Sequence, residues 1–307
     1  MRYSTTSLAL QLLPVPAPVK RVHSALLMCL VVASLSTSLV ASGVPKAAAS
    51  SLDDCTQTDD MHRVIAGCTR VAEEGWVTQL AMVLNNRGNA YEALDHLDQA
   101  ARDYDQAIAL NPHYATAYFN RGLLHARREQ FDRALSDFTI LIDMEEGSPR
   151  AYHMRGYVYE KLGQFDLAIA DFNIALALDP GFVQSLNNRG VVLRKTREFQ
   201  RALADFDAAL ALDPAYVLAR TNRSRVLVDL DKVDQAIDEL TAIVDLRPRF
   251  VEAYLARAEA YERLARRVEA LADYRRALEL APSNPRIVGH IARLEVRTEP
   301  EGVEKGN

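Results

Sequence analysis

Apolar and small residues recur along most of the chain in a fixed order of spacings. Counted from residue 81, they fall at positions 4, 8 and 11 and then at 17, 20, 24 and 27, and the order restarts every 34 residues. Spacings of three and four place side chains on one face of an α-helix. Each period therefore predicts two amphipathic helices joined by a short turn.

This period runs through six consecutive units without an insertion or a deletion. Position 20 is alanine in every unit, position 8 is glycine in the first four, and position 32 is proline in all but the second. Proline cannot continue a helix, so it ends the second helix of each unit. Glycine inside a helix costs about 1 kcal/mol, which implies that a neighbouring helix comes close there. The units are 81–114, 115–148, 149–182, 183–216, 217–250 and 251–284.

These positions resemble the tetratricopeptide repeat, a helix-turn-helix unit, and the resemblance covers residues 81–284. Glu146 in place of proline and Arg267 at position 17 are the main departures from the pattern. The resemblance implies an all-α fold, a right-handed α-solenoid of stacked 34-residue repeats. Terminal repeats need a cover for their apolar face, so we expect residues 285–297 to form a capping helix. The polar residues 298–307 are predicted to be a disordered tail.

Residues 50–80 are interpreted as a degenerate N-terminal repeat, in which Cys55 falls at position 11 and Cys68 at position 24. These two positions face each other within a unit of this family. The resemblance therefore implies a disulfide between Cys55 and Cys68, with two free buried thiols as the alternative.

The first 49 residues differ from the rest of the chain. Lys20 and Arg21 precede an uncharged stretch at 24–41, and small residues follow it. This order is typical of a secretory signal peptide and predicts a periplasmic or secreted protein, in a compartment where disulfides form. The alternative is an uncleaved membrane anchor at residues 24–41, which would be the only membrane contact we expect.

Charge and motifs limit the chemistry. The chain beyond residue 49 carries 32 basic and 41 acidic residues, a balance that argues against a nucleic-acid partner. Seven histidines are scattered without metal-ligand spacing, and no catalytic or phosphate-binding motif is present. We therefore predict no metal, no cofactor and no enzyme activity.

Two charged rows run through the repeats. Position 7 is arginine and position 23 is acidic in all six units, which predicts an ion pair between the two helices of each unit. The alternative is that both rows are solvated. The arginines are Arg87, Arg121, Arg155, Arg189, Arg223 and Arg257, and the acids are Asp103, Asp137, Asp171, Asp205, Glu239 and Asp273.

The resemblance also implies that positions 2, 5, 6, 9 and 13 line a concave groove. An asparagine row there resembles the ladder by which some family members hold an extended peptide, although asparagine is also common at this position. The family's carboxylate clamp is matched only by Asn89, Asn120 and Arg150, because Asn85 and Met154 stand where the clamp is basic. The candidate partner-binding residues are Asn86, Asn120, Asn188, Asn222, Phe119, Leu123, Arg150, His153 and Tyr157.

The sequence thus predicts a non-enzymatic interaction module of the cell envelope that binds a peptide or protein in its groove. The alternative is a structural adaptor that uses its convex face or its ends and leaves the groove empty. An enzyme is the third and least supported class.

Overall fold

The computed structural model describes residues 46–56, 59–74 and 79–296. The predicted disordered tail at 298–307 and most of the predicted signal peptide or anchor lie outside the described residues. A helix already begins at Lys46, ahead of the boundary that the sequence suggested at residue 50. Within the described ranges, no helix is both long and apolar enough to cross a bilayer.

The described part of the chain is built from helix pairs. Two helices precede the regular repeats, a single helix follows them, and each 34-residue unit contributes two. The bounds are α2 (Lys46–Thr56), α3 (Met61–Glu73), α4 (Leu80–Ala93), α5 (Leu97–Leu110), α6 (Ala115–Arg127), α7 (Phe131–Met144), α8 (Pro149–Lys161), α9 (Phe165–Leu178), α10 (Val183–Lys195), α11 (Phe199–Leu212), α12 (Val217–Asp229), α13 (Val233–Leu246), α14 (Val251–Arg263), α15 (Arg267–Leu280) and α16 (Pro285–Val296).

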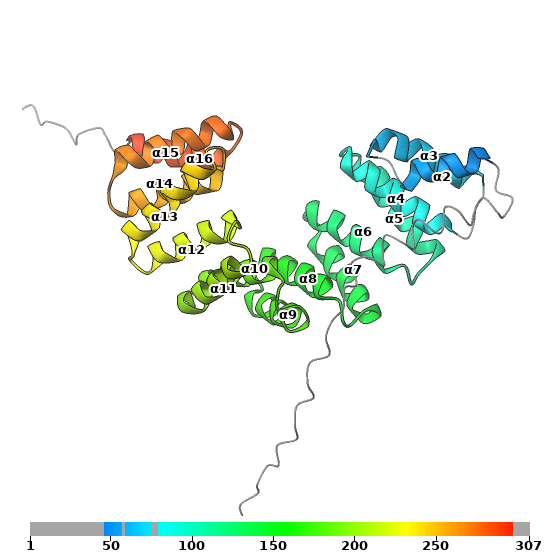
Figure 1. Ribbon diagram of the computed structural model, residues 1–307, viewed down its shortest axis with the longest axis horizontal. Coiled ribbons are helices and arrows are strands. Elements are labelled where there is room, and N and C mark those ends of the chain that lie inside the picture. The colour runs from blue at the N-terminus through cyan, green and yellow to red at the C-terminus, as the bar shows by residue number, and fades with distance from the viewer. Residues whose placement is uncertain (1–45, 57–58, 75–78, 297–307) are drawn as a thin grey trace, which may run out of the picture.

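The pairs stack into an arch. Figure 1 shows the first helices α6, α8 and α10 along its inner side and the second helices α7, α9 and α11 along its outer side. The structure therefore confirms the predicted α-solenoid of 34-residue helix pairs, with a concave face made by first helices.

The two helices of a unit come close together at position 8. A Cβ added at Gly88 would lie 2.6 Å from Tyr104 Cε1, and one at Gly190 would lie 2.8 Å from Phe206 Cε1. Both aromatic rings are fully buried. Glycine at position 8 therefore makes room for the aromatic ring at position 24 of the same unit. The fifth unit has the smaller Leu240 at position 24 and tolerates Ser224, whereas the sixth combines Ala258 with Tyr274.

The turn between the two helices of each of the six regular units passes through a left-handed residue at position 15. Only Gly163 is a glycine; the others are Asp95, Glu129, Arg197, Asp231 and Ala265, with φ between 56° and 66°. In the first unit, the His96 N–H donates to the Tyr91 carbonyl at 2.8 Å across this residue. The left-handed residue thus ends the first helix and lets the residue after it donate to one of the last carbonyls.

Changing position 15 should alter stability in opposite directions in two units. A left-handed residue with a Cβ costs about 1–2 kcal/mol. Replacing such a residue by glycine removes this strain, but part of the stabilisation is lost because glycine has more conformational freedom in the unfolded chain. We therefore expect Ala265→Gly to raise the free energy of unfolding by about 0.5–1 kcal/mol. Gly163→Ala should lower it, although no atom lies within 4 Å of its added Cβ. Urea unfolding of both variants checks this, and shifts of the same sign would contradict it.

The last helix covers the open end of the array, as predicted. Ile287 and Leu294 of α16 are buried in one apolar cluster with Tyr254 and Tyr274 of the sixth unit. Arg293 of α16 adds an ion pair to Glu262 at 2.7 Å. The cap therefore removes apolar surface from water at the point where the repeat pattern stops.

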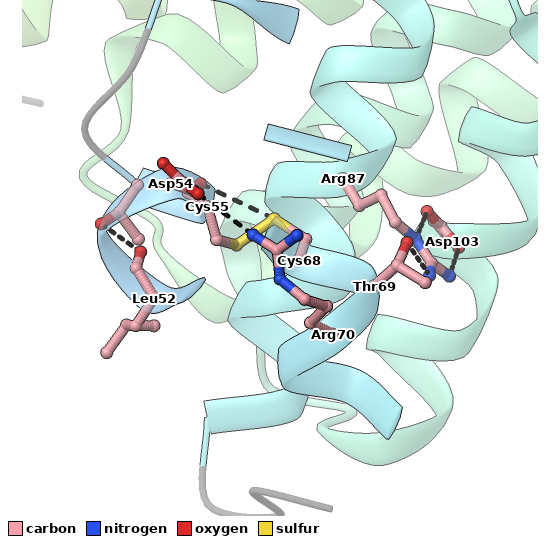
Figure 2. The surroundings of a disulfide bond; sticks show 9 residues. Leu52, Asp54, Cys55, Cys68, Thr69, Arg70, Arg87 and Asp103 are labelled. Atoms are coloured by element: carbon pink, nitrogen blue, oxygen red, sulfur yellow. Dashed lines mark hydrogen bonds and ion pairs between the residues drawn. A yellow bond between two sulfur atoms is a disulfide. The ribbon is translucent and has the colours of Figure 1, made fainter. Parts of the chain in front are cut away.

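The N-terminal unit is held differently from the six regular ones. Cys55 of α2 and Cys68 of α3 form the predicted disulfide, with their Cα atoms 4.7 Å apart (Figure 2). The helices are unusually close here, because a Cβ on Gly67 would lie 2.8 Å from the Ser51 carbonyl oxygen. Asp54 of α2 adds ion pairs to Arg63 and Arg70 of α3.

Candidate functional site

The two charged rows form an ion pair in each regular unit, which confirms the prediction from the sequence. In five units the Nε and Nη2 groups of the arginine donate to the two carboxylate oxygens of an aspartate. Arg223 instead reaches Glu239 through Nη1. The aspartates are almost fully buried, and the hydrogen bond that Arg155 donates to Asp171 raises the pKa of the Arg155 guanidinium. These pairs therefore join the two helices of a unit inside the array.

Each arginine also reaches the preceding unit. Figure 2 shows Arg87 between Asp103 of its own unit and Thr69 of α3. The acceptor side chains in the later units all stand at position 25. They are Asp105, Thr139, Asn173, Asp207 and Thr241. We call the arginine with its two acceptors the arginine bridge, because it links three helices of two successive units.

The bridge changes at both ends of the array. In the N-terminal unit, the positions equivalent to 7 and 23 are Ser51 and Gly67, and the Cys55–Cys68 disulfide joins the two helices instead. In the sixth unit, position 25 is Arg275, which pairs with Glu295 of α16 at 2.8 Å. The arginine bridges therefore organise the interior of the array and do not form a ligand site.

Fewer side chains of the groove are accessible to a ligand than the sequence suggested, because position 5 is buried in four of the six units and His153 is among them. His153 keeps only 8% of its surface exposed and packs against Phe172 and Phe182. Its Nδ1 lies 2.8 Å from the Ser185 hydroxyl of the next unit. Burial lowers the pKa of His153 to about 4, so the ring is neutral near neutral pH. The prediction that His153 binds a partner is therefore wrong, because this side chain is buried at the junction with the next repeat.

Two of the four asparagines in the row, Asn120 and Asn222, bind the preceding repeat. The Asn120 amide donates to Asn85 of the preceding unit at 2.9 Å, and Asn222 donates to Asn187 at 3.0 Å. Asn187 in turn donates to Asn188 at 3.1 Å. These amides hold adjacent first helices together, as a polar seam along the inner side of the arch. Asn86 is half-buried at the start of the row.

The partial carboxylate clamp is also used inside the protein. Asn120 donates to the Asn89 side-chain oxygen at 2.9 Å, and the Tyr104 hydroxyl donates to the same oxygen at 2.7 Å. A ligand carboxylate would have to displace these bonds. The structure therefore gives no support to a carboxylate site at Asn89 and Asn120.

One accessible apolar patch of the groove lies over α6 and α8. Phe119, Leu123, Met154 and Tyr157 are half-buried against the core of the second and third units, so one side of each remains exposed. The exposed Arg150 lies over the Phe119 ring, with its guanidinium carbon 5.0 Å from the ring centre. We call these five residues the central groove patch. It offers an apolar surface with a cation at its edge.

The described residues also contain no group of three or more His, Cys, Asp and Glu side chains placed to hold a metal ion.

Comparisons with known proteins agree with this architecture. The family model described as tetratricopeptide repeat matches residues 85–152, 153–217 and 221–285. No curated protein matches the chain by sequence.

Solved structures match the fold at low identity. A tetratricopeptide repeat protein from Parabacteroides merdae superposes with a TM-score of 0.68 at 16% identity, over 77% of this chain and 93% of that one. A chain of the APC/C hetero-tetramer Cut9-Hcn1 superposes with a TM-score of 0.65 at 19% identity. The match covers 76% of this chain and 46% of that one. TTC0263 from Thermus thermophilus gives 0.54 at 23% identity, over 59% of this chain and 99% of that one.

Proposed function

Because the chain belongs to the tetratricopeptide repeat family, whose members serve protein interaction, we propose that it is a non-enzymatic module that holds a peptide or protein segment in its concave groove. The observation that carries this proposal is the central groove patch. Aromatic and arginine side chains contribute most of the binding energy at protein interfaces. Phe119, Tyr157 and Arg150 place both types on adjacent first helices of the inner face.

The patch also indicates the chemistry of the ligand. Half-buried aromatic rings leave apolar area that a partner side chain can cover, which releases water from both surfaces. Arg150 has no ion pair with any residue in the described part of the chain, and its charge remains available to a partner carboxylate. A segment with an apolar anchor and a neighbouring acidic residue fits this combination.

The compartment is part of the proposal. The order of basic, apolar and small residues at 1–49 is that of an export signal, and the Cys55–Cys68 pair suits an oxidising environment. We place the function in the cell envelope, where the module would bind a periplasmic or secreted partner.

Reversing the charge of Arg150 tests the groove. We expect Arg150→Glu to weaken binding of groove ligands by at least about tenfold, because it places a carboxylate where the partner's acid lies. The probes are peptides selected from a phage-displayed library of random linear sequences on the wild-type protein, and their affinities are measured by fluorescence anisotropy. Arg150 is exposed and forms no ion pair with a residue that the structure describes, so we expect the variant to fold.

The matched control is Arg133→Glu, which makes the same charge change at an exposed site on the outer helix α7. Equal affinity of the selected peptides for both variants would contradict groove binding. It would favour an adaptor that uses its convex face.

A further inference from the structure

A cavity of about 400 Å³ lies at the edge of the array where the turns within the fourth to sixth units are found. Its apolar walls are Phe199, the first residue of α11, and Val228 near the end of α12. Its remaining lining is charged, and it comes from the ends of the first helices α10, α12 and α14 and from one turn. We call this cavity the rim pocket.

Two of the cations at the rim pocket are already neutralised. Arg194 pairs with Asp229 of the next unit, and Lys195 pairs with Glu160 of the preceding one. These pairs bridge successive repeats, as Arg127 does with Asp95 farther along the same edge at 2.7 Å. They are therefore part of the packing between units.

The other two cations are different. Arg197 and Arg263 both line the cavity and are exposed, and neither has an ion pair with any residue that the structure describes. Arg263 ends α14, where a helix dipole favours a cation. Arg197 follows the end of α10 in the left-handed turn with φ of 66°, where the dipole of that helix favours a cation in the same way. Two guanidinium groups thus line one cavity without a counter-charge of their own.

Guanidinium groups bind carboxylates through paired hydrogen bonds, and apolar walls beside them favour a ligand with both kinds of group. We infer that the rim pocket binds an acidic peptide, with one carboxylate on Arg197 and Arg263 and an adjacent apolar side chain on Phe199 and Val228. This inference rests on the proposed function, because it gives the peptide in the groove a second anchor beyond the central groove patch.

The pocket is tested with a defined probe. A fluorescein-labelled peptide of alternating leucine and glutamate should bind the wild-type protein, as measured by fluorescence anisotropy, and the same peptide with glutamine in place of glutamate should not. Arg197→Gln/Arg263→Gln should weaken binding of the acidic peptide by at least about tenfold, because each lost hydrogen bond involves two charged groups. The matched control is Arg102→Gln/Arg133→Gln, which removes the same charge from exposed sites on the outer helices α5 and α7.

Three results would overturn the inference. Equal losses in the pocket variant and the control variant would mean that only net charge matters. Binding of the glutamine peptide with the same affinity would exclude a carboxylate anchor. If free glutamate displaced the labelled peptide at the same concentration as the unlabelled peptide does, the pocket would be a small-molecule site instead.

The Arg150→Glu variant separates this inference from the proposed function. If Arg150→Glu leaves binding of library-selected peptides unchanged while the pocket variant weakens binding of the acidic peptide, groove binding fails and the rim pocket stands. If Arg150→Glu weakens binding of the library-selected peptides while the pocket variant binds the acidic peptide as the control variant does, the rim-pocket inference fails and groove binding stands.

Discussion

Replacing Asp171 by alanine should lower the free energy of unfolding by about 3 kcal/mol, because it leaves the Arg155 guanidinium without its carboxylate inside the array. The Asp171 side chain is only 5% exposed, and its two oxygens accept hydrogen bonds of 2.8 and 2.9 Å from Arg155. Removing one partner of a buried pair strands the other charge. The measurement is chemical unfolding followed by circular dichroism.

The matched control is Asp98→Ala, which breaks the ion pair of Asp98 with Arg128 at 2.5 Å. The Asp98 side chain is 77% exposed, so we expect the free energy of unfolding to fall by no more than about 1 kcal/mol. This figure includes the loss of the favourable interaction between the Asp98 carboxylate and the helix dipole in the first turn of α5. Equal losses in the two variants would contradict a role for burial. The double variant Arg155→Met/Asp171→Leu should recover part of the stability, because it leaves no unpaired charge.

Reducing the Cys55–Cys68 disulfide should destabilise the N-terminal unit by about 3 kcal/mol in the chain-entropy model, because the bond closes a loop of moderate length. This unit has no arginine bridge of its own to join its two helices, so the loss should be concentrated in α2 and α3. Hydrogen exchange with and without a reducing agent measures it. The Cys55→Ser/Cys68→Ser variant is the control, since its exchange should not respond to the reductant.

The bond itself is checked on the protein purified from an oxidising compartment. Alkylation without reduction, followed by mass spectrometry, should leave Cys55 and Cys68 unlabelled. Labelling of both residues would show two free thiols and would remove the basis for this prediction.

The sequence predicted features that repeat at fixed positions. The pairing of Arg155 with Asp171 followed from two rows of opposite charge, and the disulfide followed from the place of Cys55 and Cys68 in a degenerate unit. Both depend on packing within one helix pair. Such contacts are set by the helical period, which the sequence contains directly.

Contacts between units were harder to predict. His153 was assigned to the groove from its helix face, but the rotation between successive units carries its side chain against the next repeat and buries it. The same rotation brings the Asn120 amide to Asn85 and aligns Arg121 with Asp105. The second contact could have been found, because position 25 carries a side-chain oxygen in each of the first five units. The rim pocket depends on three successive helix ends and has no signal in a single unit.

Hydrogen exchange of the wild-type protein with and without a library-selected peptide tests the central claim most directly. Groove binding predicts slower exchange on the inner helices α6 and α8, which carry Phe119, Arg150 and Tyr157, and unchanged exchange on the outer helices α7 and α9. Protection confined to α7, α9 and the other second helices would contradict a ligand in the groove.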